Sequence, residues 1–247
     1  MISVTESFPV DRSSEFDEIA SEYGKLWTAR LYDNLIVSAL PPNCGFVLDL
    51  GCSTGALTEK LSANAEHVLA IDASSKALDL ARQKVTAPNV EFKRQSIENA
   101  PEMVKPGSCD AIVASRSLHH CEALPSLIRA LVSLLNTNGR LIILELYGTG
   151  IYAGNKVYRN FINIAYKLNI LVNGLRQHCF STALNGLRQE GRFFSTDAWQ
   201  SHMKSEPNFN SNTLLSLMKT NKLFTTSSDQ NTKFRLFIGE KHMPEDH

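Results

Sequence analysis

A glycine-bearing turn between two acidic residues is the part of this sequence best suited to bind a ligand. Asp49 lies in a short apolar run, Gly51 and Gly55 follow it closely, and Asp72 ends the next apolar run. Glycine lets a ligand approach the backbone, and a carboxylate can accept hydrogen bonds from both hydroxyls of a ribose. The spacing therefore predicts a nucleoside-binding loop. The alternative role for Asp72, a helix N-cap, is one that the serines just after it can fill.

The charge of Asp49 discriminates between nucleoside ligands. A dinucleotide-binding loop reads G-x-G-x-x-G/A, whereas the three positions here are Gly51, Ser53 and Ala56, so the central glycine is absent. A carboxylate beside the turn repels a pyrophosphate and attracts a ligand that carries an ammonium group. The loop thus favours S-adenosylmethionine over NAD, and an NAD-dependent dehydrogenase is a distant alternative.

Such a loop needs a parallel sheet that brings the ends of its strands together. Short apolar runs alternate with helical patterns along the first two thirds of the chain, which predicts buried parallel strands with helices on both faces. The strands are expected at 46–50, 67–71, 90–93, 110–114 and 140–146, and the helices at 54–62, 74–85 and 124–135. Two alternating runs at 223–228 and 233–240 predict an antiparallel hairpin. The fold class is therefore α/β, with a Rossmann-like, seven-stranded, mostly parallel sheet.

Three regions are expected along the chain. Residues 1–40 form an N-terminal segment, helical from residue 15 until two prolines end the helix. Residues 41–148 and 211–247 form the Rossmann-like core. Residues 149–210 form a helical cap, inserted after the fifth strand, that binds the acceptor; its main helices are predicted at 155–176 and 179–190, the second ending before Gly191.

The predicted cap is basic and carries an apolar stripe. Between residues 151 and 195 a single acidic residue, Glu190, stands against six basic ones: Lys156, Arg159, Lys167, Arg176, Arg188 and Arg192. This pattern is compatible with a bulky lipophilic acceptor that bears an acid group, with contact to an anionic membrane surface, or with a homodimer interface. It is equally compatible with a helix pair that has a solvated basic face and an apolar core.

The overall composition narrows the class of protein. The chain has 247 residues, and its 25 basic and 25 acidic residues balance, which argues against a general nucleic-acid binder. The five cysteines are odd in number and lack metal-type spacing, so free thiols in a reducing, cytoplasmic compartment are expected, without a metal. No signal peptide and no membrane-spanning apolar run are recognised.

Several motifs, taken in order, resemble the class I S-adenosylmethionine-dependent methyltransferases. The likeness is greatest to the small-molecule branch that includes the menaquinone and ubiquinone C-methyltransferases. The segments that carry it are 47–55, 70–73, 90–101, 109–120 with its Leu-His-His ending, and 134–146. The resemblance implies S-adenosylmethionine as methyl donor, S-adenosylhomocysteine as product, and the strand order 3-2-1-4-5-7-6 with the seventh strand antiparallel.

The resemblance also implies which residues contact the cofactor. They are Tyr23, Asp49, Gly51, Cys52, Ser53, Gly55, Asp72, Ala73, Ser96, Ile97 and, through its backbone carbonyl, Ser115. Two positions depart from the family pattern, because Ser53 replaces a glycine and Ser96 replaces the aspartate that holds the adenine. A hydroxyl is a weaker acceptor than a carboxylate, so modest cofactor affinity is expected unless Glu98 substitutes.

Two adjacent histidines are the candidate catalytic bases. His119 and His120 follow the fourth predicted strand, and an unperturbed imidazole titrates near pH 6.5, which suits a base at neutral pH. A base is needed only when the acceptor must lose a proton. The alternative is that one of them orients the loop or packs against the cofactor. Glu145, near the end of the fifth predicted strand, is a weaker candidate that can be a purely structural acceptor.

The leading functional hypothesis is therefore a methyltransferase that acts on a small, lipophilic or aromatic acceptor. A second hypothesis is an RNA- or tRNA-modifying methyltransferase. The basic cap is compatible with it, but no added RNA-binding domain is evident and no amino-methylation motif of the N/D-P-P-Y/F type follows Ala114. A third is a protein that binds the cofactor without transferring a methyl group, which Ser96 leaves open. A small-molecule partner is expected rather than nucleic acid.

Overall fold

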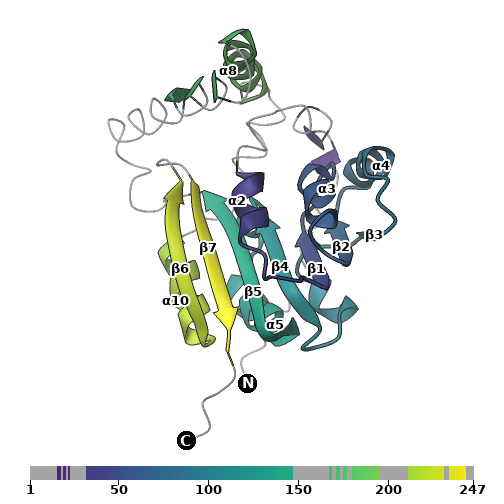
Figure 1. Ribbon diagram of the computed structural model, residues 1–247, viewed down its shortest axis with the longest axis vertical. Coiled ribbons are helices and arrows are strands. Elements are labelled where there is room, and N and C mark those ends of the chain that lie inside the picture. Colours follow the sequence, from purple (N-terminus) through teal and green to yellow (C-terminus); the bar gives the residue numbers. More distant parts are fainter. Residues whose placement is uncertain are drawn as a thin grey trace, which may run out of the picture.

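One mixed sheet organises the chain (Figure 1). The computed structural model describes residues 16–17, 19–20, 22, 32–146, 167–168, 171–172, 175–176, 180–194, 211–230 and 234–242. The strands are β1 (Phe46–Leu50), β2 (His67–Asp72), β3 (Val90–Arg94), β4 (Cys109–Ser115), β5 (Leu135–Leu146), β6 (Leu223–Gln230) and β7 (Phe234–Lys241). Their order across the sheet is β3-β2-β1-β4-β5-β7-β6, as the resemblance implied.

The order of the strands reverses between β1 and β4. The strands β3, β2, β1, β4 and β5 are parallel to one another, whereas β7 is antiparallel to both β5 and β6. From β1 the chain builds the sheet outward through β2 and β3, and then returns to add β4 on the other side of β1. Ligands of open α/β sheets bind at the carboxyl ends of the strands where the order reverses in this way. The predicted sheet and its antiparallel hairpin are confirmed.

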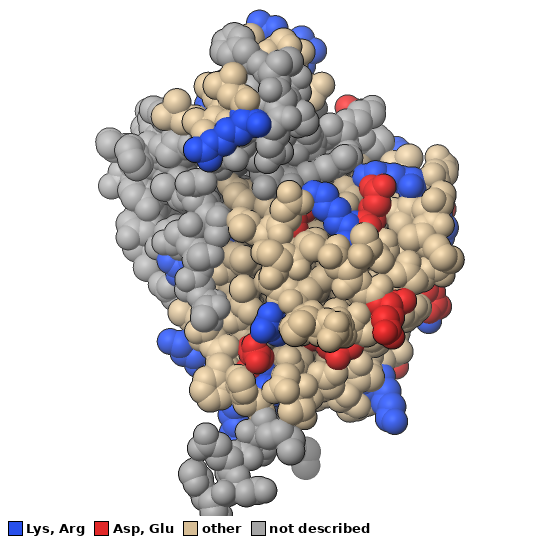
Figure 2. Space-filling view, viewed as in Figure 1, with Lys and Arg blue, Asp and Glu red and all other residues tan. Residues whose placement is uncertain are grey.

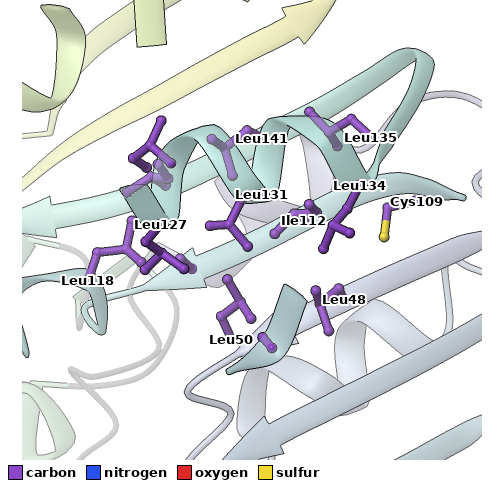
Figure 3. Packing of buried hydrophobic residues seen from close by; sticks show 14 of the residues in the cluster. Leu48, Leu50, Cys109, Ile112, Leu118, Leu127, Leu131, Leu134, Leu135 and Leu141 are labelled. Carbon is purple, nitrogen blue, oxygen red and sulfur yellow. The ribbon is translucent and has the colours of Figure 1, made fainter. Parts of the chain in front are cut away.

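Both faces of the sheet are buried, because alternate residues of each strand enter different cores. Leu48 and Leu50 of β1 belong to one cluster, and Val47 belongs to the other. The first cluster lies under α5 (Leu124–Leu134), α10 (Ser211–Thr220) and the short 3₁₀ helix η2 (Ala100–Met103), and Figure 3 shows leucines of α5 directed at β1, β4 and β5. The second lies under α2 (Asp33–Ser38), α3 (Ala56–Ser62) and α4 (Ser75–Lys84).

Two element boundaries differ from the sequence prediction for local reasons. Helix α3 begins at Ala56 rather than at residue 54, because Gly55 has a left-handed φ of 75° that a helix cannot contain. Strand β5 begins at Leu135, before the predicted turn. Cys109 pairs with Leu135 while the next paired residue, Ala111, is opposite Arg140, so residues 136–139 bulge out of the strand. The turn is present, but within the strand.

The side chain of Arg140 joins the residues that follow α2 to the sheet. The described residues among 16–22 are helical, and α2 ends beside Ala39, just before the two prolines. Arg140 of β5 donates from Nη1 to the carbonyl oxygens of Ala39 (3.1 Å) and Leu40 (3.3 Å), and from Nε to Glu240 of β7 (2.9 Å). The prediction of one continuous helix over 15–40 is wrong at Tyr32, which is the N-cap from which α2 begins, and residues 23–31 lie outside the described part of the chain.

The described part of the predicted cap lies beyond one end of the sheet. Helix α8 (Phe180–Phe194) lies past the edge at which β5 ends (Figure 1), and Leu187 packs against the second core cluster. The prediction that Gly191 ends this helix is wrong. α8 continues through it, since a glycine within a helix costs only about 1 kcal/mol relative to alanine. Of the predicted helix 155–176, the described residues are helical.

Candidate active site

The loop between β1 and α3 is fastened to the end of β2 by its own backbone. The N–H groups of Gly51 and Cys52 both donate to the carbonyl oxygen of Ile71, each over 2.9 Å. The next N–H, of Ser53, donates to Oδ2 of Asp72 over 2.8 Å. The predicted glycine loop and the predicted ribose acceptor are therefore held together before any ligand binds.

Gly51 stands where the loop meets two other segments. Its φ is 74°, and a Cβ atom added to it would lie 2.7 Å from Cβ of Ser117 and 3.5 Å from Cδ1 of Ile97. Both the backbone conformation and the contact with Ser117 require glycine here. The sequence predicted Gly51 and Ile97 as neighbours of one ligand, but it did not single out Ser117, whose Oγ donates to the carbonyl oxygen of Leu50 over 2.9 Å.

Ser53 and Gly55 complete the turn in different ways. Ser53 has a φ of 49°, so a serine adopts the left-handed conformation that glycine adopts at lower cost. Gly55 has a φ of 75° and packs against α4, where an added Cβ would lie 3.0 Å from side-chain atoms of both Ala81 and Val85. The turn is therefore closed on α4 as well as on β2.

Asp72 uses both carboxylate oxygens to join two loops. Oδ1 accepts from the N–H of Ser74 (2.9 Å) and Oδ2 accepts from Ser53, while burial raises the pKa of Asp72 despite these bonds. The helix N-cap is Ser74, whose Oγ accepts from the N–H of Ala77 over 2.9 Å. Each carboxylate oxygen has two lone pairs, so the bonds described leave capacity for ligand hydroxyls. The neighbouring Ala73 accepts from Nε of Arg94 through its carbonyl oxygen (3.1 Å).

Asp49 lies beneath the loop. Its side chain is buried (1% exposed) and Oδ2 accepts from Oγ1 of Thr58 over 2.7 Å. Burial raises the pKa of Asp49 to about 7, with a smaller contribution from the nearby carboxylate of Asp72. At neutral pH the carboxyl group is therefore only partly ionised. A cation that approaches the loop would favour the ionised form.

Ser96 presents a buried hydroxyl beside the glycine loop. Its Oγ has no hydrogen-bond partner among the described residues, although its N–H donates to Oε1 of Gln95 over 2.9 Å. A buried polar atom of this kind is compatible with a ligand group as its partner. Glu98, the expected substitute acceptor, instead lies beside Cys121, where burial and then this carboxylate raise the pKa of the thiol.

Two other predicted contacts are located only in part. Ser115 ends β4, opposite Leu144 of β5, and its buried Oγ also has no hydrogen-bond partner within the described ranges. The proposed role of its carbonyl oxygen stays a prediction. Tyr23 lies outside the described residues.

Glu145 contacts His119 and the backbone that precedes it. It is fully buried in β5, and its Oε1 accepts from the N–H groups of Ser117 (2.9 Å) and Leu118 (2.7 Å). Oε2 lies 2.8 Å from Nδ1 of His119, in the 3₁₀ helix η3 (Leu118–His120). His119 as a residue is 8% exposed, and the centroid of its ring lies 4.0 Å from that of His120.

The charge state of Glu145 follows from these contacts. Burial alone raises the pKa of a carboxyl group, but the positive charge that His119 and His120 carry when protonated, the hydrogen bond with His119 and the N–H of Leu118 outweigh it and leave the pKa of Glu145 below its ordinary value. Glu145 is therefore ionised. Sequence reasoning ranked it below the histidines, although a glutamate inside an apolar strand is a signal in itself, because glutamate is almost never fully buried unless it is paired.

The described N-terminal residues reach across this end of the sheet. The ring of Phe16 meets the ring of His120 edge to face, with 4.9 Å between centroids. Asp17 accepts from Oγ of Ser74 and from the N–H of Lys76 (3.1 Å). The segment thus joins the loop after β2 to the loop after β4, on either side of the glycine turn.

The surface of the described cap residues is basic. Lys167, Arg176, Arg188 and Arg192 are all exposed, and Figure 2 shows basic side chains over α8. Within the described ranges, no group of three or more His, Cys, Asp or Glu side chains is placed to hold a metal ion. None of the described helices combines the length and apolar character needed to span a bilayer.

The strand order with a reversed last strand, the glycine turn after β1 and the acidic residue that ends β2 are the features that the resemblance to class I S-adenosylmethionine-dependent methyltransferases implied. A family model described as a methyltransferase domain matches residues 47–139. The resemblance inferred from the motifs is thereby confirmed, with S-adenosylmethionine as the cofactor of the class.

Curated relatives are similar over about half of the chain. The ubiquinone biosynthesis O-methyltransferase of Xanthomonas axonopodis pv. citri is 30% identical over 152 residues, which are 55% of this chain and 62% of that protein. The protein of that name from Albidiferax ferrireducens is 28% identical over 139 residues, 53% of this chain and 52% of that protein. The chain thus spans little more than half the length of these relatives.

Solved structures share the fold over a greater length. An S-adenosylmethionine-dependent methyltransferase from Mesorhizobium loti aligns with a TM-score of 0.58 at 14% identity, covering 85% of this chain and 98% of that one. The N-methyltransferase NodS from Bradyrhizobium japonicum, in complex with S-adenosylhomocysteine, aligns with a TM-score of 0.59 at 13% identity, covering 93% and 97% of the two chains.

Proposed function

We propose that this protein transfers the methyl group of S-adenosylmethionine to a small, lipophilic or aromatic acceptor. The observation that carries the proposal is the loop after β1, where Gly51 is pressed against Ser117 and the following N–H groups are fastened to the end of β2. The loop lies between two carboxylates at the carboxyl ends of the strands, Asp49 beneath it and Asp72 bonded to Ser53, a combination that suits an adenosine bearing a cationic amino acid.

The described residues fit the cofactor. Asp72 would accept from the ribose hydroxyls, and the buried hydroxyl of Ser96 would face the adenine. Asp49 would attract the ammonium group, and the carbonyl oxygen of Ser115 would accept from it. When bound, S-adenosylmethionine supplies a methyl group on a positively charged sulfur. The chain itself supplies orientation, exclusion of water and, where the acceptor needs it, a base.

The acceptor chemistry is proposed from the histidines and the cap. His119 or His120 would take a proton from an acceptor hydroxyl, and the similarity to O-methyltransferases supports a hydroxyl acceptor. Residues 149–210 would form the acceptor-binding cap on the Rossmann-like core. Leu168, Val172 and Leu175 are exposed beside basic side chains there, which supports a lipophilic acceptor that bears an acid group.

Calorimetry with three ligands tests the cofactor assignment. We expect S-adenosylmethionine and S-adenosylhomocysteine to bind and NADH to give no heat of binding, because the carboxylate of Asp49 beside the turn repels the pyrophosphate of a dinucleotide. Binding of NADH alone would contradict the proposal. With the cofactor established, a mass-spectrometric screen of lipophilic phenols and acids for a mass gain of one methylene would find the acceptor.

Cofactor affinity should depend on pH through Asp49. The pKa of this group is about 7 in the folded protein, and an ammonium group favours its ionised form, so binding below about pH 7 must expel a proton. The affinity for S-adenosylhomocysteine is therefore expected to fall as the pH drops below about 7, by up to about tenfold per pH unit. Calorimetry between about pH 5.5 and 8 measures this slope.

The variant Asp49→Asn is the control for that measurement. It cannot ionise, so its affinity should be lower at pH 8 and nearly independent of pH over the same interval. His119 and His120 both remain in the variant. An unchanged slope in Asp49→Asn would therefore assign the pH dependence to another group and exclude Asp49 as its source.

A further inference from the structure

We propose that Glu145 is a positioning residue, which holds the ring of His119 in the tautomer protonated at Nδ1 so that Nε2 takes the proton from a weakly acidic hydroxyl of the acceptor. The proposal rests on the methyltransferase function proposed above, and it adds the residue that orients the base and the class of acceptor that needs one.

The division of hydrogen bonds at Glu145 supports this role. Oε1 accepts from the two backbone N–H groups of Ser117 and Leu118, and Oε2 lies 2.8 Å from Nδ1 of His119. An ionised carboxylate can only accept hydrogen bonds, so Nδ1 must carry a hydrogen and donate it. A neutral imidazole that donates from Nδ1 has its lone pair on Nε2. The carboxylate thus selects which nitrogen is basic.

The same carboxylate fixes the ring relative to the cofactor loop. Its Oε1 holds the backbone at Ser117, and Ser117 in turn donates to Leu50 (2.9 Å) and contacts the position of Gly51. Oε1 thus fixes this backbone, and Oε2 of the same carboxylate fixes the histidine ring.

The proton transfer balances with these groups alone. The O–H bond of the acceptor breaks, its electron pair remains on the oxygen, and the proton passes to Nε2 of His119. The ring becomes an imidazolium whose charge is opposed by the Glu145 carboxylate at 2.8 Å, and no proton moves to Glu145, which stays ionised. The acceptor class is therefore a phenol or enol that is mostly neutral at physiological pH.

The variant Glu145→Gln tests the tautomer directly. Its amide oxygen can still accept from the two backbone N–H groups, but its NH₂ group would donate to Nδ1 of His119 and move the ring proton to Nε2. NMR of the full chain labelled with ¹⁵N-histidine, with S-adenosylhomocysteine bound, distinguishes the tautomers. We expect the proton on Nδ1 in the wild type and on Nε2 in the variant. Glu91→Gln, an exposed position on β3, should leave the ring unchanged.

The wild-type spectrum alone can overturn the proposal. A His119 ring that is protonated at Nε2 only, or that is still cationic at pH 8, is incompatible with a base at Nε2, whether or not Glu145→Gln folds. An identical tautomer in the wild type and a folded Glu145→Gln variant would also overturn it. The absence of S-adenosylhomocysteine binding in the wild type would instead overturn the proposed function, and the tautomer could still be read.

The rates of methylation of two probe acceptors distinguish a Glu145 that orients a base from one that only maintains the structure. Catechol must be deprotonated during the reaction, whereas the more acidic hydroxyl of 4-nitrocatechol is largely ionised beforehand. Glu145→Gln should slow methylation of catechol by about 10²-fold or more, and that of 4-nitrocatechol much less. Equal slowing of both acceptors would mean a structural role only. If neither catechol is methylated, the ring tautomer decides.

Discussion

Replacing Gly51 with alanine should abolish measurable cofactor binding and lower the free energy of unfolding by about 2–4 kcal/mol. A left-handed φ of 74° costs about 1–2 kcal/mol for an alanine, and the new Cβ atom 2.7 Å from Cβ of Ser117 adds an overpacking cost of similar size. Relief of that contact would push Ser117 away from the turn, so the loop after β4 would move with it. Urea denaturation and calorimetry with S-adenosylhomocysteine measure the two effects.

Gly107 offers a matched control for this substitution. It too has a left-handed φ, of 71°, but an added Cβ atom would meet nothing within 4 Å. Gly107→Ala should therefore lose only the conformational part, about 1–2 kcal/mol, and bind the cofactor like the wild type. Equal losses of stability in the two variants would show that the contact with Ser117 imposes no requirement for glycine at residue 51.

Replacing Asp72 with alanine should weaken binding of S-adenosylhomocysteine by about 10- to 100-fold, which corresponds to roughly 1–3 kcal/mol for hydrogen bonds to a charged group. The variant loses the ribose acceptor that we propose, and it also leaves the N–H groups of Ser53 and Ser74 without the acceptor that joins their loops. Calorimetry at pH 8, where Asp49 is ionised, isolates this effect from the titration of Asp49.

Asp79→Ala is the comparison for Asp72. Asp79 is an exposed aspartate of α4 that pairs with Arg82 over 3.3 Å, so its removal changes the net charge equally without touching the loop. Its affinity for S-adenosylhomocysteine should match that of the wild type. Unchanged affinity in Asp72→Ala would remove this carboxylate from the proposed site, and an equal loss in both variants would indicate a general effect of charge.

The sheet could be predicted because its signals are local. A strand that is buried on both faces must be apolar at nearly every position, so β1, β2 and β4 stand out as short runs bounded by polar or glycine residues. The start of β5 could not be predicted in the same way, since the bulge over residues 136–139 exists only because Cys109 pairs with Leu135 on the far side of it. At Gly191 a local signal misled the prediction, because glycine commonly ends a helix but α8 continues through it.

The residues of the site could likewise be predicted only where their signal is local in the sequence. Gly51 and Asp72 could be predicted because each follows directly from its position at a strand end. The contact between Leu50 and Ser117 joins residues 67 positions apart, and the bond between His119 and Glu145 joins residues 26 apart, so no periodicity reveals either one. The partly protonated state of Asp49 was likewise invisible, because it depends on how completely α3 and the sheet exclude water around the carboxyl group.

The guanidinium group of Arg140 has a consequence for how the protein opens. It holds the carbonyl oxygens that follow α2, near the beginning of the chain, and the carboxylate of Glu240, near its end. Local unfolding proceeds in cooperative units defined by such contacts rather than by chain order. Helix α2 and strand β7 should therefore belong to one such unit, so opening of β7 would also release the residues that follow α2.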